Sequence, residues 1–371
     1  MHRKAMLLVA ILSALSLAAA QEPEPVVVKL AKLPIGNVYV SPEAHQILAS
    51  VDGRRAESGC LKLWNVAQDN SEVLIDADTD NPNIIACTPD WTIGARVTFA
   101  NNDPRGVGNR FTVSIHLFKP STLETIRTIG KFQAGIHAFL LNISPNGNYL
   151  AYGMSFPGNG DPKRDQPGGI RVFETGTGKE LLYISTNIDG VFDLAISPDG
   201  KYLAGIIIEG NTRSVRVWEV PTAKLLGTLE GHNGPVMALR FSPDGQWLAT
   251  VALDGAAILW NPAKGFAKSI VLRKDSGALQ ALAFNADGSL LAVAGKQGVV
   301  TIWNTKTKKP AATFHRPKPK PPAKNDENGI LCLSFDKDGK FLTAGAEDGV
   351  VRIWPIATAT ATGPDTKTQD K

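Results

Sequence analysis

Apolar and polar residues alternate in short segments along most of the chain, and residues typical of turns separate these segments. From residue 239 to residue 260 the sequence reads LRFSPDGQWLATVALDGAAILW. The same order of segments recurs from residue 194 (LAISPDGKYLAGIII) and from residue 282 (LAFNADGSLLAVAGKQGVVTIW). Alternation with a period of two predicts strands, and Asp-Gly is typical of the tight turns that join antiparallel strands. The pattern therefore predicts an all-β protein built from internal repeats.

The apolar residue before each Ser-Pro-Asp-Gly-like turn marks the repeat unit. Seven such residues follow one another at intervals of 43 to 56 residues: Val40, Cys87, Ile143, Ile196, Phe241, Phe284 and Phe335. In each unit a third strand-like segment ends in an aromatic residue: Trp64, Phe118, Phe173, Trp218, Trp260, Trp303 and Trp354. A single four-stranded unit cannot bury both of its faces, so the units must stack into a ring. We expect a seven-bladed β-propeller over residues 21–356, with four-stranded antiparallel blades and each aromatic side chain packed between neighbouring blades.

The last unit lacks its fourth strand. Residues 357–371, which follow its third segment, have the composition of a flexible tail. An apolar segment near the other end of the chain, at residues 26–30, is the candidate for the missing strand. We therefore expect an N-terminal strand to close the ring.

The unit from residue 231 to residue 262 resembles a WD repeat. It carries Gly231-His232 near its start, Asp254-Gly255 in the turn before the third strand, and Trp260 at the position of the signature tryptophan. The seventh copy is close to this pattern, the fourth and sixth less so, and the first three diverge. The resemblance implies a structural hydrogen-bond network of His, Asp and Trp. Because only the fifth copy has the Gly-His pair, we expect that network in one blade at most, with His232 in a structural role.

The first 20 residues have the layout of a secretory signal peptide. Arg3 and Lys4 precede an apolar run, and Ala18-Ala19-Ala20 precedes the expected cleavage after Ala20. An uncleaved transmembrane anchor is the alternative, but the run is short for a bilayer span. We therefore expect a secreted or periplasmic protein without membrane insertion. Removing Arg3 and Lys4 lowers the formal net charge from +4 to +2, which argues against nucleic acid as a partner.

The sequence offers no catalytic or metal-binding motif. It lacks a Gly-x-Ser-x-Gly nucleophile elbow, its three cysteines lack metal-binding spacing, and its histidines fall in different units. We expect Cys60, Cys87 and Cys332 to be buried thiols. The acidic segment from Asp76 to Asn81 lacks the Gly and Glu of a Ca²⁺ loop, so we interpret it as a solvated loop, with Ca²⁺ binding left as the alternative. The prediction is therefore of no cofactor, no metal and no catalytic residue.

The WD-repeat resemblance also implies where a partner binds. In the family, a residue at the start of each first strand faces the mouth of the central channel. Four residues before each aligned apolar position, these residues are Gly36, Asn83, Phe139, Phe192, Met237, Gln280 and Leu331. Four of the seven are large and apolar, and such a patch on a soluble protein indicates an interaction surface. A register slip of one residue would instead turn the side chains inward.

The loops between second and third strands are long in the first three copies and short in the last three. The long loops are rich in Gly and Pro and carry charged residues, among them Arg105 and Arg164, which we expect to form a polar rim around the apolar mouth. The leading hypothesis is a non-catalytic scaffold that binds a protein or peptide partner at this face. A hydrolase or lyase with acids at the channel mouth is the alternative, and a sugar-binding propeller is a third hypothesis.

Overall fold

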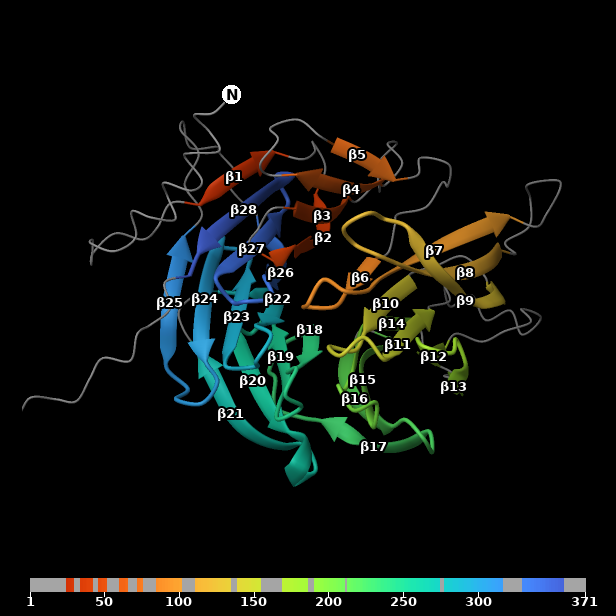
Figure 1. Ribbon diagram of the computed structural model, residues 1–371. Helices are drawn as coiled ribbons and strands as arrows, with labels where there is room; N and C mark the ends of the chain where they lie inside the picture. Colours follow the sequence, from red (N-terminus) through yellow and green to blue (C-terminus); the bar gives the residue numbers. More distant parts are fainter. Residues whose placement is uncertain are drawn as a thin grey trace, which may run out of the picture.

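The computed structural model is a ring of seven four-stranded antiparallel sheets (Figure 1). Residues of the first strands line a cavity at the centre of the ring, here called the central channel. It describes residues 25–29, 34–42, 46–51, 60–65, 72–75, 85–101, 111–134, 139–154, 169–185, 190–210, 212–273, 277–315 and 329–356. The predicted signal peptide, the tail at 357–371 and the Asp76–Asn81 segment lie outside these ranges. The predicted seven-bladed β-propeller is confirmed.

Each blade is numbered by the order of its first strand, which lies next to the channel. The first strands are β2 (Ile35–Val40), β6 (Ile85–Cys87), β10 (Phe139–Ile143), β14 (Gly190–Ile196), β18 (Val236–Phe241), β22 (Leu279–Phe284) and β26 (Ile330–Phe335). The second strands are β3 (Gln46–Val51), β7 (Gly94–Asn101), β11 (Tyr149–Met154), β15 (Tyr202–Glu209), β19 (Leu248–Ala252), β23 (Leu290–Gly295) and β27 (Phe341–Ala346). The third strands are β4 (Cys60–Asn65), β8 (Phe111–Phe118), β12 (Gly169–Glu174), β16 (Thr212–Glu219), β20 (Ala256–Asn261), β24 (Val299–Asn304) and β28 (Val350–Pro355).

The fourth strands form the outer rim. They are β5 (Glu72–Ile75), β9 (Thr125–Ala134), β13 (Glu180–Ser185), β17 (Lys224–Leu229), β21 (Ala267–Arg273), β25 (Pro310–His315) and, for blade 7, β1 (Val26–Lys29). A short 3-10 helix, η3 (Pro262–Lys264), links β20 to β21. Alternation along the chain thus yields strands in every unit, as the sequence predicts.

The N-terminal strand closes the ring. β1 pairs antiparallel with β28, with Val26 opposite Ile353 and Lys29 opposite Val350 (Figure 1). Val28 is buried in a cluster that includes Val351 of blade 7 and residues of blade 1. Blade 7 is therefore built from both ends of the chain, which confirms the prediction.

The recurring turn after each first strand is held by one repeated hydrogen bond. A side-chain oxygen on the residue after the strand accepts the backbone N–H five residues later, at 2.7 to 3.1 Å, in all seven blades. The acceptors are Ser41, Thr88, Ser144, Ser197, Ser242, Asn285 and Asp336. A short polar side chain that mimics a backbone acceptor is what such turns require, and this explains why the sequence repeats Ser-Pro-Asp-Gly.

The aromatic residues at the ends of the third strands pack between blades. Each belongs to a core cluster that contains residues of the preceding blade; Trp260, for example, packs against Val217 of blade 4. The Trp354 indole of blade 7 stacks on the Phe314 ring of blade 6, with centroids 5.8 Å apart. The same arrangement holds for the other five aromatics, so the predicted inter-blade packing is confirmed.

Candidate functional site

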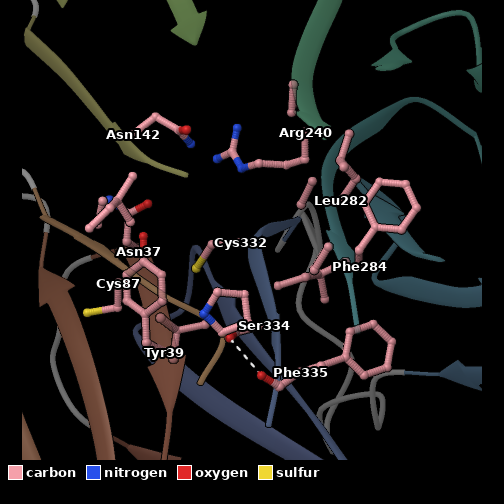
Figure 2. A pocket seen from close by; sticks show the side chains of 18 of the residues that line it. Asn37, Tyr39, Cys87, Asn142, Arg240, Leu282, Phe284, Cys332, Ser334 and Phe335 are labelled. Carbon is pink, nitrogen blue, oxygen red and sulfur yellow. Dashed lines mark hydrogen bonds between the residues drawn. The ribbon is translucent and has the colours of Figure 1, made fainter. Parts of the chain in front are cut away.

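The face on which the first strands begin, here called the entry face, surrounds one end of the central cavity. The cavity measures about 180 Å³ and runs from residues at the starts of first strands, such as Gly36 and Gln280, to turn prolines such as Pro145 and Pro243. Figure 2 shows the side chains that converge on it. The cavity therefore extends along the channel toward the opposite face.

Five first strands carry a β-bulge at the position that the sequence predicts to face the mouth. The strand register is interrupted at one residue in each of blades 1, 4, 5, 6 and 7: Gly36, Phe192, Met237, Gln280 and Leu331. A bulged residue is left out of the ladder, and the bulge changes the direction of its side chain. The bulges thus set this position apart in the backbone, a feature that the sequence pattern does not reveal.

Three of the bulge residues line the cavity. Gly36, Gln280 and Leu331 all contribute to its wall at the mouth, and Leu331 and Gln280 are half-buried. The Gln280 Nε2 atom is buried and has no hydrogen-bond partner among the described residues. A buried amide without a partner favours a ligand that accepts a hydrogen bond.

The other two bulge residues enclose an arginine from the neighbouring third strand. The Arg213 guanidinium lies 3.6 Å from the centre of the Phe192 ring, and its Nη1 donates to the Met237 sulfur at 2.9 Å. All three side chains are half-buried. Burial lowers the pKa of Arg213, which stays charged at neutral pH. The predicted apolar pair therefore holds a cation, and sequence reasoning missed this arginine. We call these three residues the Arg213 cluster.

The remaining predicted site residues are placed only in part. Phe139 begins β10 in regular register opposite Met154, so blade 3 has no bulge there, and its side chain is outside the description. Asn83, Arg105 and Arg164 lie outside the described residues. The polar rim predicted for the long loops therefore stays a prediction.

Deeper in the channel, an ion pair joins blades 4 and 5. Arg240 Nη1 donates to Asp193 Oδ2 at 2.6 Å, and Asp193 also accepts the N–H groups of Leu239 and Leu194. Burial opposes the charge of Arg240, but Asp193 outweighs it and raises the pKa of Arg240. The Arg240 side chain is 38% exposed and reaches into the cavity toward Asn142 (Figure 2).

Other side chains join the first strands across the channel wall. The Tyr39 hydroxyl donates to the Ile85 carbonyl at 3.3 Å, and Asn142 Oδ1 accepts the Ile196 N–H at 3.3 Å. These bonds satisfy backbone groups on strand edges that have no further strand beside them. Lone polar residues within otherwise apolar first strands, such as Asp193 in FDLAI and Arg240 in MALRF, are the sequence signal that could have identified this layer.

The channel thiols are not poised for chemistry. Cys87 and Cys332 are free and both line the cavity, and burial raises the pKa of both. The pKa of Cys332 rises to about 12, so its thiol is protonated at neutral pH and is a poor nucleophile. The prediction of buried thiols is confirmed for Cys87, whereas Cys332 is half-buried and the Cys60 side chain is outside the description.

Blade 5 contains the hydrogen-bond network that the WD-repeat resemblance implies. The two ring nitrogens of His232 contact Asp254 Oδ2 at 3.2 Å and Thr250 Oγ1 at 2.7 Å, and the Trp260 indole N–H donates to the same hydroxyl at 2.9 Å. Burial opposes the ionisation of Asp254, but N–H donors from Ala256 and Asn233, with His232, lower its pKa. The structural role predicted for His232 is confirmed. We call His232, Thr250, Asp254 and Trp260 the blade 5 network.

The cavity wall is poor in charge. Among the described residues that line it, Arg240 is the one side chain charged at neutral pH. Within the described ranges no group of three or more His, Cys, Asp or Glu side chains has an arrangement suited to a metal ion. The arrangement can therefore accept a polar group but does not place paired carboxylates for acid–base chemistry.

Comparisons with known proteins identify the repeat. The family model described as WD domain, G-beta repeat, matches residues 179–219, 223–261, 269–304 and 322–355. These matches fall on blades 4 to 7, the copies in which the sequence pattern is clearest. A comparison with curated proteins finds no significant match. In the part of the chain that the structure describes, no helix has both the length and the apolar character needed to cross a membrane.

Proposed function

Because the chain is a WD-repeat β-propeller, we propose that it is a scaffold that binds a protein or peptide partner at its entry face. WD-repeat propellers are generally non-catalytic and typically bind protein partners. The observation that carries the proposal is the set of bulges at five of the seven predicted mouth positions. Backbone irregularities of this kind often adjoin functional sites, because they redirect side chains out of the sheet.

The chemistry of the mouth supports binding more than catalysis. An enzyme of the hydrolase or lyase type needs converging acids at the mouth. Among the described residues, Asp193, which pairs with Arg240 of the cavity wall, already accepts hydrogen bonds from Arg240, Leu239 and Leu194. A carboxylate that already accepts these hydrogen bonds stabilises the fold and is poorly suited to acid–base catalysis. We therefore favour the scaffold function.

We further propose that the scaffold acts outside the cytoplasm after cleavage behind Ala20. The support is the layout of residues 1–20, with Arg3 and Lys4 ahead of an apolar run. N-terminal sequencing of protein from cell fractions tests this. A chain that begins at Gln21 in a secreted or periplasmic fraction is expected, and an intact N-terminus in the cytoplasm would contradict the proposal.

Site-specific photocrosslinking tests the entry face. A benzoylphenylalanine at Gln280 lies at the mouth, whereas the same residue at Leu225, which is 48% exposed on β17, lies on the outer rim. After irradiation in the native compartment, adducts are separated and identified by mass spectrometry. Adducts from position 280 and none from position 225 are expected. The reverse distribution would show that partners bind the rim and would refute the proposed face.

A further inference from the structure

The Arg213 cluster presents a fixed cation on the entry face. Stacking on Phe192 and the contact with Met237 hold the guanidinium in one orientation and shield one side of it from water. A planar guanidinium has five N–H donors, and the contact with Met237 is the hydrogen bond that Arg213 makes within the described residues. Within the described part of the chain, the other donors are therefore available to a ligand.

Three of the described carboxylates of blades 4 and 5 near this face are engaged elsewhere. Glu209 forms an ion pair with Arg216, with Oε2 and Nη2 2.5 Å apart. Asp254 belongs to the blade 5 network, and Asp193 forms an ion pair with Arg240. Within the described residues no carboxylate forms an ion pair with Arg213, and burial is the sole cause that shifts its pKa. A half-buried cation without a carboxylate gains more from an incoming anion than a solvated cation does.

The path from the cluster into the cavity carries further donors. Arg240 follows Met237 by three residues on β18, which is about 10 Å of strand, and its guanidinium is partly exposed in the cavity. The buried Gln280 Nε2 lacks an acceptor at the same mouth. Two guanidiniums and an amide thus offer N–H groups to one ligand.

We propose that the partner presents carboxylates to the entry face, as an extended acidic peptide segment, and that Arg213 is the residue that recognises its first carboxylate. This proposal rests on the proposed scaffold function and names the chemistry of its partner. A guanidinium binds a carboxylate through two parallel hydrogen bonds, and the contact with the Phe192 ring at 3.6 Å restricts where the guanidinium can lie. Arg240 and Gln280 then offer donors to a second acidic side chain within the channel.

Fluorescence anisotropy with defined peptides tests the proposal. The probes are fluorescein-labelled peptide amides of the sequence Gly-Glu-Gly-Gly-Glu-Gly, the same peptide with Gln for Glu, and a phosphoserine version. We expect the Glu peptide to bind at least tenfold more tightly than the Gln peptide. Arg213→Gln should weaken binding of the Glu peptide at least tenfold, as expected for the loss of a guanidinium–carboxylate pair with two charge-assisted hydrogen bonds. The affinity of Arg213→Lys for the Glu peptide should lie between those of wild type and Arg213→Gln. Lysine keeps the charge but loses the contact of the guanidinium with the Phe192 ring.

A matched control removes a cation elsewhere. Lys224 is exposed at the start of the outer strand β17, so Lys224→Gln should leave the peptide affinity unchanged. Thermal melting checks that each variant is folded. Equal affinity for the Glu and Gln peptides, no detectable binding at millimolar peptide, or full affinity in a folded Arg213→Gln variant would each refute the proposal. Binding of the phosphoserine peptide alone would also refute it.

The two proposals fail in different ways. If crosslinking at Gln280 captures the same partner from wild type and from Arg213→Gln, the scaffold stands and acidic recognition is wrong. If position 280 gives no adduct although the Glu peptide binds through Arg213, the face recognises carboxylates and the protein scaffold is wrong.

Discussion

Blades 5 and 7 carry the same turn aspartate and the same closing tryptophan, but they stabilise the aspartate from different elements. In blade 5, Asp254 contacts His232, which precedes the first strand, and Thr250 of the second strand links His232 to Trp260. In blade 7, Asp348 instead accepts a hydrogen bond from Arg352 of the third strand, with Nη2 2.6 Å from Oδ2.

The difference follows from one pair of facing residues. Thr250 lies opposite Ile258 in blade 5, whereas Ala344 lies opposite Arg352 in blade 7. At this pair of positions the polar residue is on the second strand in blade 5 and on the third strand in blade 7. In both blades the carboxylate of the turn aspartate has a side-chain hydrogen-bond partner. The comparison teaches that the repeat needs a partner for this carboxylate but does not need a particular one.

The largest expected effect comes from the blade that the two chain ends share. Deleting residues 21–32 removes β1, with buried Val28 and the pairing to β28, whereas blade 5 loses nothing. We expect a loss of about 4 kcal/mol in the free energy of unfolding, because apolar burial and a whole strand ladder are lost. Thermal melting of the deletion variant and wild type measures this loss of stability. Val27→Ser changes a side chain that is 55% exposed on the same strand, so it is the control and should melt at the same temperature as wild type.

Breaking the ion pair of blade 7 should be the next largest effect. Asp348→Ala leaves the Arg352 guanidinium, whose side chain is 8% exposed, without this carboxylate. We expect a cost of about 3 kcal/mol in urea unfolding, since an uncompensated buried charge is costly. The double variant Asp348→Ala with Arg352→Met removes both charges and should recover most of the loss. If the double variant is as unstable as the single one, the pair is not the cause.

Blade 5 should respond to loss of its hydroxyl. Thr250→Val keeps the shape of the side chain but leaves the Trp260 N–H and one His232 nitrogen without their shared partner. We expect a loss of about 1 to 2 kcal/mol by denaturant titration. Thr343→Val in blade 7 makes the same change at a buried threonine whose hydroxyl has no partner among the described residues, so it serves as the control. A stability for Thr250→Val equal to wild type would show that the network contributes little.

The smallest effect has the opposite sign and concerns the turn after the first strand. Blade 5 uses Ser242 there and blade 7 uses Asp336, which is buried and has one carboxylate oxygen without a partner among the described residues. Asp336→Ser keeps an acceptor for the Phe341 N–H, and we expect it to stabilise the protein by about 1 kcal/mol at neutral pH.

The pH dependence of that variant provides a second test. Burial is the main cause that raises the pKa of Asp336, so the folded protein binds its proton more tightly than the unfolded chain does. The contribution of Asp336 to stability therefore falls as pH rises from its unfolded pKa, about 3.9, through its raised folded pKa. The gain from Asp336→Ser should grow over that window and stay constant above it. A gain that is independent of pH would exclude the buried charge as the cause.

The architecture was predictable because it depends on local patterns. Period-two alternation, the Ser-Pro-Asp-Gly turns and the aromatic after each third strand recur at every unit, and each reports a contact that the same unit or its neighbour makes. The closing role of β1 followed from a missing fourth strand in the last unit. His232 was assigned correctly because the Gly-His pair occurs once.

The site was predictable only in its positions. The alignment of the seven repeats identified Phe192, Met237 and Gln280. It could not show that a β-bulge leaves each of them out of the strand pairing. It also could not show that Arg213, which belongs to a different strand of blade 4, is held between Phe192 and the Met237 of the next blade. Such contacts depend on the distance between adjacent blades, which no single repeat encodes.

The pairing of β1 with β28 also has a kinetic consequence. It joins segments more than 300 residues apart in sequence, so loop closure over almost the whole chain precedes the final contact. During synthesis the ring stays open until β28 has been made. If another protein binds the β1 segment in the meantime, blade 7 stays incomplete. The ring therefore closes only when β1 and β28 are both free to pair.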